Sequence, residues 1–120
     1  MPEVPPSHLV ISDLLKRAPE LKNEPGWEYF REGISVRWLY QEPNNGPAAA
    51  LLNYQPGAAV PRHEHQGYEH ILVLDGSQSD ELGRYPAGTL VINRPGSSHP
   101  VISQEGCVVL IIWERGIKFL

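Results

Sequence analysis

From residue 27 onward, apolar residues occur in short runs that are separated by glycine, proline and asparagine. The run 34–40 alternates between apolar and polar positions, as a strand does when one of its faces is buried. Runs of about four to eight residues between turn residues predict β-strands. Strands that recur at this spacing predict a β-sandwich or barrel. The predicted strands are 27–30, 34–40, 48–55, 69–74, 89–92, 100–103 and 107–113, with a polar hairpin around 79–83.

Turn residues are expected to set the ends of these strands. The loop 42–47 contains an Asn-Gly pair, which supplies backbone conformations with positive φ. The pair Asp75-Gly76 is expected to end the strand 69–74, and a further turn is predicted at 93–96. The elements are therefore predicted to be short and joined by turns.

Residues 1–24 differ from the rest and are predicted to form an N-terminal arm, with the β-barrel domain spanning 25–120. Three prolines exclude a helix at its start: Pro2, Pro5 and Pro6. Residues 12–18 then favour one or two helical turns, capped by Ser12 and ended by Pro19, because a proline disfavours helical geometry in the residue before it. A helix this short is marginal by itself, so the arm is expected to lie on the barrel or on a second subunit.

Proline and glycine are abundant. Of 120 residues, 12 are proline and 11 are glycine, and the proline share is about double average usage. Helix interiors disfavour both residues, so their abundance favours strands joined by turns. Hydrophobic residues still make up 41% of the chain, which is sufficient for a packed core. The composition therefore predicts an all-β domain.

Charge and length exclude several classes of protein. The formal net charge is −4, so neither nucleic acid nor an anionic membrane is expected as a partner. No apolar run approaches the roughly 18 residues that span a bilayer, and the first ten residues lack the basic start and apolar stretch of a signal peptide. Cys107 is the single cysteine, which excludes an intramolecular disulfide framework. We expect a cytoplasmic protein of one domain.

Three histidines and one glutamate have a spacing with chemical meaning. His63 and His65 are two residues apart, so on an extended strand both project from the same face. Glu69 follows after a glycine-containing turn, and a later antiparallel strand can bring His99 opposite the first pair. Three imidazoles and one carboxylate form a donor set that suits Zn, Fe, Mn, Ni or Cu. The spacing alone leaves open the alternative that these are surface histidines or hydrogen-bonded core histidines.

The frame around these residues matches two motifs of a known superfamily. The first motif consists of Gly57, five residues, His63-x-His65, three residues, Glu69, six residues and Gly76. The second motif usually reads glycine, five residues, Pro-x-Gly, two residues, histidine, three residues and asparagine. Here it runs from Gly88 to Ser103, which replaces the asparagine, and Arg94 replaces the first proline. With both motifs present, the chain resembles a cupin.

Within the cupins, the chain resembles the ChrR-like group, which is named for the C-terminal domain of an anti-sigma factor. The likeness rests on the segments 67–77, 79–81, 85–88, 95–99 and 105–107. It implies a small antiparallel β-barrel, or jelly roll, preceded here by the short helical arm. It also implies that one divalent transition-metal ion (Zn, Fe, Mn or Ni) is bound per chain, with the ligands His63, His65, Glu69 and His99.

The resemblance implies two functions that the residues do not separate. The first is a metal-dependent dioxygenase acting on a small diketone or enol in the barrel, with Glu69 as a ligand or as a base. The second is a non-catalytic, zinc-binding sensor or regulatory module. A third hypothesis is a small-molecule-binding barrel with adventitious metal. The anti-sigma factor for which the group is named binds its sigma factor through a separate N-terminal zinc domain. Residues 1–24 lack a His/Cys zinc motif, so no such sigma-binding domain is expected in this chain.

Other polar residues near the motifs are expected to be structural. His70 should point away from the carboxylate ligand, to the surface or to a dimer interface. Glu64 should be solvated, and His8 lies in the arm, outside the site. Arg62 and Arg94 are expected to carry surface charge or a structural ion pair rather than to bind a substrate carboxylate.

The run 107–113 is apolar at nearly every position. A strand that is apolar on both faces is covered on both sides, and in a chain of this size a second subunit is a reasonable cover. Because cupins of this size also pair, we predict a homodimer. Cys107 is expected to be a buried, inert thiol. Four aromatic residues are expected in the core or at an interface rather than around a ligand: Trp38, Tyr54, Tyr68 and Trp113.

Overall fold

The computed structural model describes residues 7–120, so the prediction for the three prolines of the first six residues lies outside it. Every strand predicted from the apolar runs is present within the described residues, and two strands are additions: β4, which carries His63 and His65, and the short β10. The elements are α1 (Leu14–Leu21), β1 (Glu28–Arg31), β2 (Ile34–Gln41), β3 (Ala48–Tyr54), β4 (Ala58–His65), β5 (Glu69–Asp80), β6 (Gly83–Pro86), β7 (Leu90–Asn93), β8 (Ser98–Ser103), β9 (Cys107–Trp113) and β10 (Ile117–Phe119).

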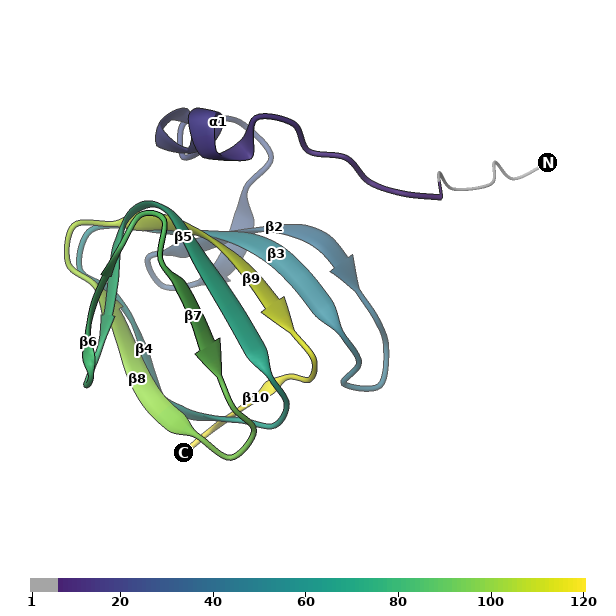
Figure 1. The fold of residues 1–120 in the computed structure, drawn as a ribbon, viewed down its shortest axis with the longest axis vertical. Coiled ribbons are helices and arrows are strands. Elements are labelled where there is room, and N and C mark those ends of the chain that lie inside the picture. Colours follow the sequence, from purple (N-terminus) through teal and green to yellow (C-terminus); the bar gives the residue numbers. More distant parts are fainter. Residues whose placement is uncertain (1–6) are drawn as a thin grey trace.

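The strands form one curled sheet with the order β1-β2-β3-β9-β5-β8-β4-β10, and β6 and β7 pair with β5. The pairing is antiparallel throughout this path, and the curl places β4 and β8 opposite β3 and β9 (Figure 1). The predicted all-β, antiparallel barrel is therefore confirmed. No helix among residues 7–120 is long and apolar enough to cross a membrane.

Strand β5 connects the two sides of the curled sheet. Its first half pairs with β9 and β7, and its second half pairs with β6 and reaches β8. The expectation that Asp75-Gly76 would end this strand is wrong, because β5 continues to Asp80. The pairing with β9 shifts by one residue between Val73 and Asp75, which is a β-bulge. Gly76 has φ 75°, and a Cβ there would collide with the Gly106 carbonyl. A bulge bends a strand and increases its twist, so the same residues that resemble a turn redirect β5 instead.

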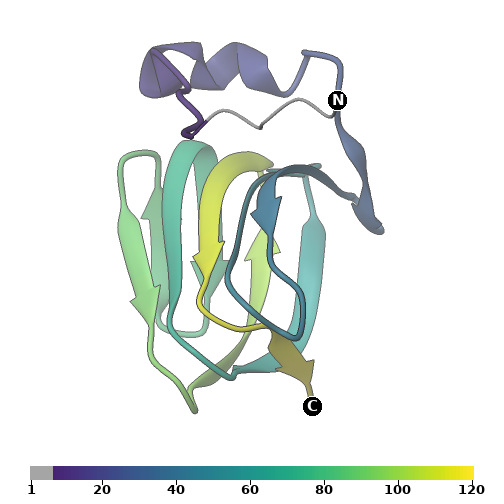
Figure 2. The same ribbon diagram turned by 90° about the vertical axis from the view of Figure 1, so that its right-hand side faces the viewer.

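Helix α1 differs from the prediction at both ends. It runs from Leu14 to Leu21 and contains Pro19, which was expected to stop it. Asp13, not Ser12, is the N-terminal cap residue, and it makes no side-chain capping hydrogen bond. The helix persists because Ala18 and Leu21 are fully buried against the barrel, and tertiary packing of this kind outweighs weak local propensity. Figure 2 shows α1 lying across one end of the barrel.

Two apolar clusters hold the fold together. The larger fills the barrel interior and includes Val36, Leu52 and Val109. The smaller joins α1 to the outer side of the sheet, where Val108 is completely buried beneath it. The outer face of β9 is thus covered at this end by the chain's own helix, whereas a second subunit was expected there. Ile112, at the other end of β9, keeps 38% of its surface exposed.

Candidate metal centre

The four residues predicted to bind metal converge inside one end of the barrel. His63 and His65 lie on β4, and their register places His63 directly opposite His99 on β8. Glu69 is the first residue of β5, which follows the short turn after β4. All four side chains are buried, and each offers a ligand atom within 4.8 Å of the others. The extended β4 therefore points both histidines to the same face, as their spacing predicts.

Hydrogen bonds orient all three imidazole rings in the same way. The Nδ1 of His63 lies 2.9 Å from the Pro61 carbonyl oxygen, and that of His65 lies 3.1 Å from the Ser97 carbonyl oxygen. The Nδ1 of His99 lies 3.2 Å from a carboxylate oxygen of Asp80. Carbonyl and carboxylate oxygens only accept, so each Nδ1 is the protonated donor. In the tautomer that donates from Nδ1, the Nε2 atoms of all three rings are directed toward the cluster.

The donor atoms lack the partners that burial requires. The Nε2 atoms of His65 and His99 are buried, and neither has a hydrogen-bond partner among the described residues. The Nε2 of His65 lies 3.3 Å from an Oε1 of Glu69, a distance that is favourable when a proton or a metal ion lies between the two atoms. Opposite ligands of a transition metal are separated by about 4.2 Å, since each bond is about 2.1 Å long. The 4.8 Å spread is close to this value, so the residues fit one metal ion.

Glu69 is held in its ionised form. The indole Nε1–H of Trp113 donates to Oε2 at 2.8 Å, and the side-chain amide of Asn93 donates to Oε1 at 3.0 Å. Burial opposes ionisation, but the imidazole of His65 beside the carboxylate, with smaller contributions from His63 and Asn93, holds the pKa of Glu69 below its usual value. Burial lowers the pKa of His63. The site therefore combines a carboxylate with a neutral imidazole, which are the protonation states that bind metal.

The supporting residues of the cluster were not predicted from sequence. Asn93 and Ser97 lie within the second motif, so nearness to His99 was the available signal for them. Trp113 was expected in the core, and it is buried there, but its bond to Glu69 joins residues 44 positions apart. Asp80 was not selected at all, although its carboxylate contacts His99.

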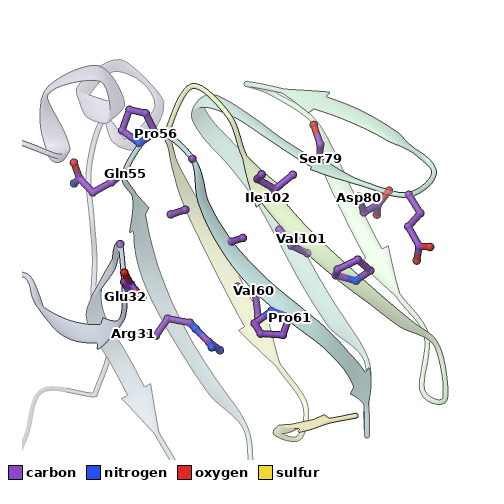
Figure 3. A pocket seen from close by; sticks show the side chains of 16 residues that line it. Arg31, Glu32, Gln55, Pro56, Val60, Pro61, Ser79, Asp80, Val101 and Ile102 are labelled. Carbon is purple, nitrogen blue, oxygen red and sulfur yellow. The ribbon is translucent and has the colours of Figure 1, made fainter.

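Two openings approach the cluster. A cavity of 290 Å³ is lined by His99, by Asn93 and Ser97, which bond to the ligands, and by Asp80. A second cleft, of 820 Å³, lies between the β1–β2 turn and strands β4, β5 and β8 (Figure 3). Its labelled lining residues include Arg31, Val60 and Asp80, and none of the four predicted ligands lines it. Asp80 lines both openings and is the link between this cleft and His99.

Three aromatic rings pack behind Glu69. Phe30, Trp38 and Trp113 have ring centroids 6.0–6.4 Å apart, and Trp113 belongs to the apolar core. They border a pocket of 260 Å³. Tyr54 is buried in the same core, whereas Tyr68 is 40% exposed. The aromatic residues thus act mainly as packing, and Trp113 also positions the carboxylate.

Other polar residues singled out in the sequence lie outside the cluster. Arg62 forms an ion pair with Glu81, which is the structural role expected for it. Arg94 and His70 line a surface pocket next to Ile112. Glu64 is half-buried on β4, and His8 is exposed in the arm. Cys107 is buried, and burial raises the pKa of its thiol to about 11, in agreement with the expected inert thiol.

A family model for the ChrR Cupin-like domain matches residues 21–115. The chain belongs to this family. The cupin resemblance inferred from the two motifs is therefore confirmed, and the four residues of the cluster lie within the matched ChrR cupin-like domain.

Known proteins resemble this ChrR cupin-like domain over most of its length. The anti-sigma-E factor ChrR of Cereibacter sphaeroides is 36% identical over 96 residues, which cover 78% of this chain and 44% of that protein. The chain thus spans less than half the length of that relative. The crystal structure of Rhodobacter sphaeroides SigE in complex with the anti-sigma ChrR matches with 30% identity and a TM-score of 0.65, covering 72% of this chain and 48% of that one.

An acetylacetone dioxygenase from Acinetobacter johnsonii has a similar fold. Its structure matches with a TM-score of 0.75 and 17% identity, and covers 100% of this chain and 81% of that one. At this identity the likeness shows a shared fold alone.

Proposed function

We propose that His63, His65, Glu69 and His99 hold one divalent transition-metal ion (Zn, Fe, Mn or Ni). The observation that supports this most strongly is the convergence of three imidazole Nε2 atoms, two of them buried without a partner, on one ionised carboxylate. When bound, such an ion supplies a Lewis-acidic centre and cross-links β4, β5 and β8. The chain's own contribution is to fix the ring orientations through the Nδ1 hydrogen bonds.

We further propose that the domain is a non-catalytic, zinc-binding sensor or regulatory module. Its 36% identity to an anti-sigma factor supports this function. Three nitrogen ligands and one oxygen ligand also complete a tetrahedral shell, and closed tetrahedral zinc sites are usually structural. The four side chains have little solvent access, with His99 the most accessible at 8% exposure.

A metal-dependent dioxygenase acting on a small diketone or enol is the second candidate. The 290 Å³ cavity that reaches His99 favours it, because a small molecule could approach the ligands there. A structural neighbour is an acetylacetone dioxygenase, although its sequence identity is 17%. In this function Glu69 would be a ligand or, if released, a base.

Elemental mass spectrometry of untagged protein, purified without chelators or added metal, separates these functions. Near one zinc per chain, with no oxygen consumption when acetylacetone is added, supports the regulatory module. Near one iron, manganese or nickel with oxygen uptake supports the dioxygenase. A His63→Ala variant with unchanged metal content would contradict the metal centre itself.

We also propose that the chain forms a homodimer through the outer face of β5, β7 and β9. Ile92 and Ile112 flank His70 in the strand register and are 52% and 38% exposed. An Ile112→Glu substitution is expected to shift the sedimentation equilibrium from dimer to monomer. The matched control is Leu82→Glu on the β5–β6 turn, where Leu82 is already 92% exposed. A wild-type chain that sediments as a monomer would contradict the dimer.

A further inference from the structure

The carboxylate of Asp80 has three partners, one on β8 and two within its own β5–β6 hairpin. Its Oδ2 accepts from the Nδ1–H of His99 at 3.2 Å. Its Oδ1 accepts from the backbone N–H of Leu82 at 2.8 Å and from the hydroxyl of Tyr85 at 2.7 Å. Leu82 lies in the turn of the β5–β6 hairpin and Tyr85 lies on β6. One buried carboxylate thus joins a proposed metal ligand to the hairpin on its outer side.

The Nδ1 of His99 has a different kind of partner from those of the other two histidines. The ring of His63 is held by the backbone carbonyl of Pro61 on β4, and that of His65 by the carbonyl and hydroxyl of Ser97 in the β7–β8 turn. The ring of His99 is held by a side chain, and a carboxylate is a stronger acceptor than a carbonyl. A carboxylate behind a metal-binding imidazole fixes its tautomer and increases the basicity of the nitrogen that binds metal.

A second contact ties the same hairpin to the site. Glu81, next to Asp80, forms an ion pair with Arg62. Arg62 directly precedes His63, a proposed metal ligand, on β4. Arg62 also donates to the hydroxyl of Ser98 at 3.2 Å, immediately before His99. The turn of the hairpin therefore contacts both strands, β4 and β8, that carry histidines. Figure 3 places Asp80 beside Ser79 at one edge of the cleft.

We propose that Asp80 is a positioning residue that orients His99 and couples metal binding to the order of the β5–β6 hairpin. The inference rests on the proposed metal centre. When the His99 ring is fixed by coordination through Nε2, its Nδ1–H is held permanently toward Asp80. The carboxylate is then fixed, and it holds the Leu82 amide and the Tyr85 hydroxyl in turn. Coupling between two sites is reciprocal, so a hairpin that orders on metal binding must also strengthen that binding.

The test measures zinc affinity by competition with a chelating dye, and hydrogen exchange of peptides covering 80–86 with and without zinc. The wild type is expected to exchange these amides more slowly when zinc is bound. Asp80→Ala is expected to bind zinc about 10- to 100-fold more weakly and to lose the zinc-dependent protection. Asp80→Asn, which keeps the size of the side chain, serves if the alanine variant does not fold, and it is expected to weaken binding in the same direction.

Two further variants separate positioning from general damage to the hairpin. Arg84→Ala removes an exposed ion pair of the same hairpin, to Glu105 at 2.7 Å, and should change neither readout. Tyr85→Phe removes one bond to Asp80 and keeps the bond to His99, so it should reduce the protection and leave zinc affinity within about threefold of the wild type.

The outcomes distinguish this inference from the metal centre on which it rests. A wild type that binds no zinc, iron, manganese or nickel contradicts the metal centre. A wild type that binds zinc, together with an Asp80→Ala variant of equal affinity or equal zinc-dependent protection, overturns the positioning role of Asp80 alone.

Discussion

The interior of the barrel has two regions, one lined by apolar side chains and the other by polar ones. In one, side chains such as Val36, Leu52 and Val109 are fully buried and purely apolar. In the other, three imidazoles and a carboxylate are equally buried and direct lone pairs at one another. Burying apolar groups stabilises a fold, whereas burying polar atoms without partners destabilises it. The apolar region accounts for folding, and the proposed metal ion would account for the burial of the polar region.

If the proposed metal centre forms, folding and metal binding should be separable in this domain. Most of the apolar region lies on β2, β3 and β9, and the ligand-bearing strands β4, β5 and β8 contribute other positions to it, such as Val60, Val73 and Val101. Substitutions in one region should therefore affect stability, and substitutions in the other should affect metal binding.

The largest effect is expected from removing a ligand in the polar region. His99→Ala should lower zinc affinity by more than about 100-fold, because three donors remain and the shell stays open. Far-ultraviolet circular dichroism should still report a folded β-domain, since the apolar region is intact. His70→Ala, which removes a histidine outside the cluster, is the control and should leave affinity unchanged.

The converse change is expected to lower stability alone. Leu52→Ala should reduce the free energy of unfolding by about 2–5 kcal/mol, through lost apolar burial and the cavity left behind. Urea denaturation of the chelated protein measures this change. At a temperature where the Leu52→Ala variant is folded, its zinc affinity should match that of the wild type. A loss of zinc affinity as large as that of His99→Ala would show that the two regions are not separable.

The polar region should make the metal-free protein sensitive to acid. Burial lowers the pKa of His63 in the folded chain below the usual 6.5 of the unfolded chain. At a pH between the folded and unfolded pKa, the unfolded chain therefore binds more protons than the folded chain. Stability should therefore fall as pH decreases below 6.5, by at most about 1.4 kcal/mol per pH unit for one such group. The pKa of Glu69 is also lowered, from 4.5, and adds a further loss in more acid solution. Chemical denaturation at several pH values should show a weaker slope between pH 5 and 6.5 for His63→Ala.

A smaller effect on zinc affinity than that of removing a ligand is expected where the two regions meet. Trp113→Phe keeps an aromatic ring beside Phe30 and Trp38 but removes the hydrogen bond to Glu69. A bond to a charged acceptor contributes about 1.5–3 kcal/mol, so stability should fall by that amount or less. Zinc affinity should fall only about threefold to tenfold, because the carboxylate keeps its bond to Asn93. Equal affinity in both proteins would show that Trp113 acts in packing alone.

Much of the fold could be predicted from the sequence because strand periodicity is local. The apolar runs and the polar hairpin indicated every strand except β4 and β10, and the cupin motifs indicated which histidines converge. Asp75-Gly76 was wrongly expected to form a turn, since turns and bulges use the same residue types. Long-range pairing with β9 decides between them. Pro19 was wrongly expected to end the helix, because the burial of Ala18 and Leu21 depends on the barrel beneath them.

The supporting residues of the candidate site lie beyond such local signals. Asp80 is 19 positions from His99, and Trp113 is 44 positions from Glu69. An aspartate near a hairpin and a tryptophan at the end of an apolar strand have common structural explanations. Only the path of β5 through both sides of the curled sheet brings them to the cluster.

The most direct measurement of the central claim is an anomalous difference map, recorded at the absorption edge of the bound metal, from crystals of the metal-loaded protein. The account predicts one peak per chain, about 2.0–2.2 Å from the Nε2 atoms of three histidines and from a carboxylate oxygen, with His63, His65, Glu69 and His99 as the four ligands. A peak confined to His8 or His70, or no peak inside the barrel, would contradict it.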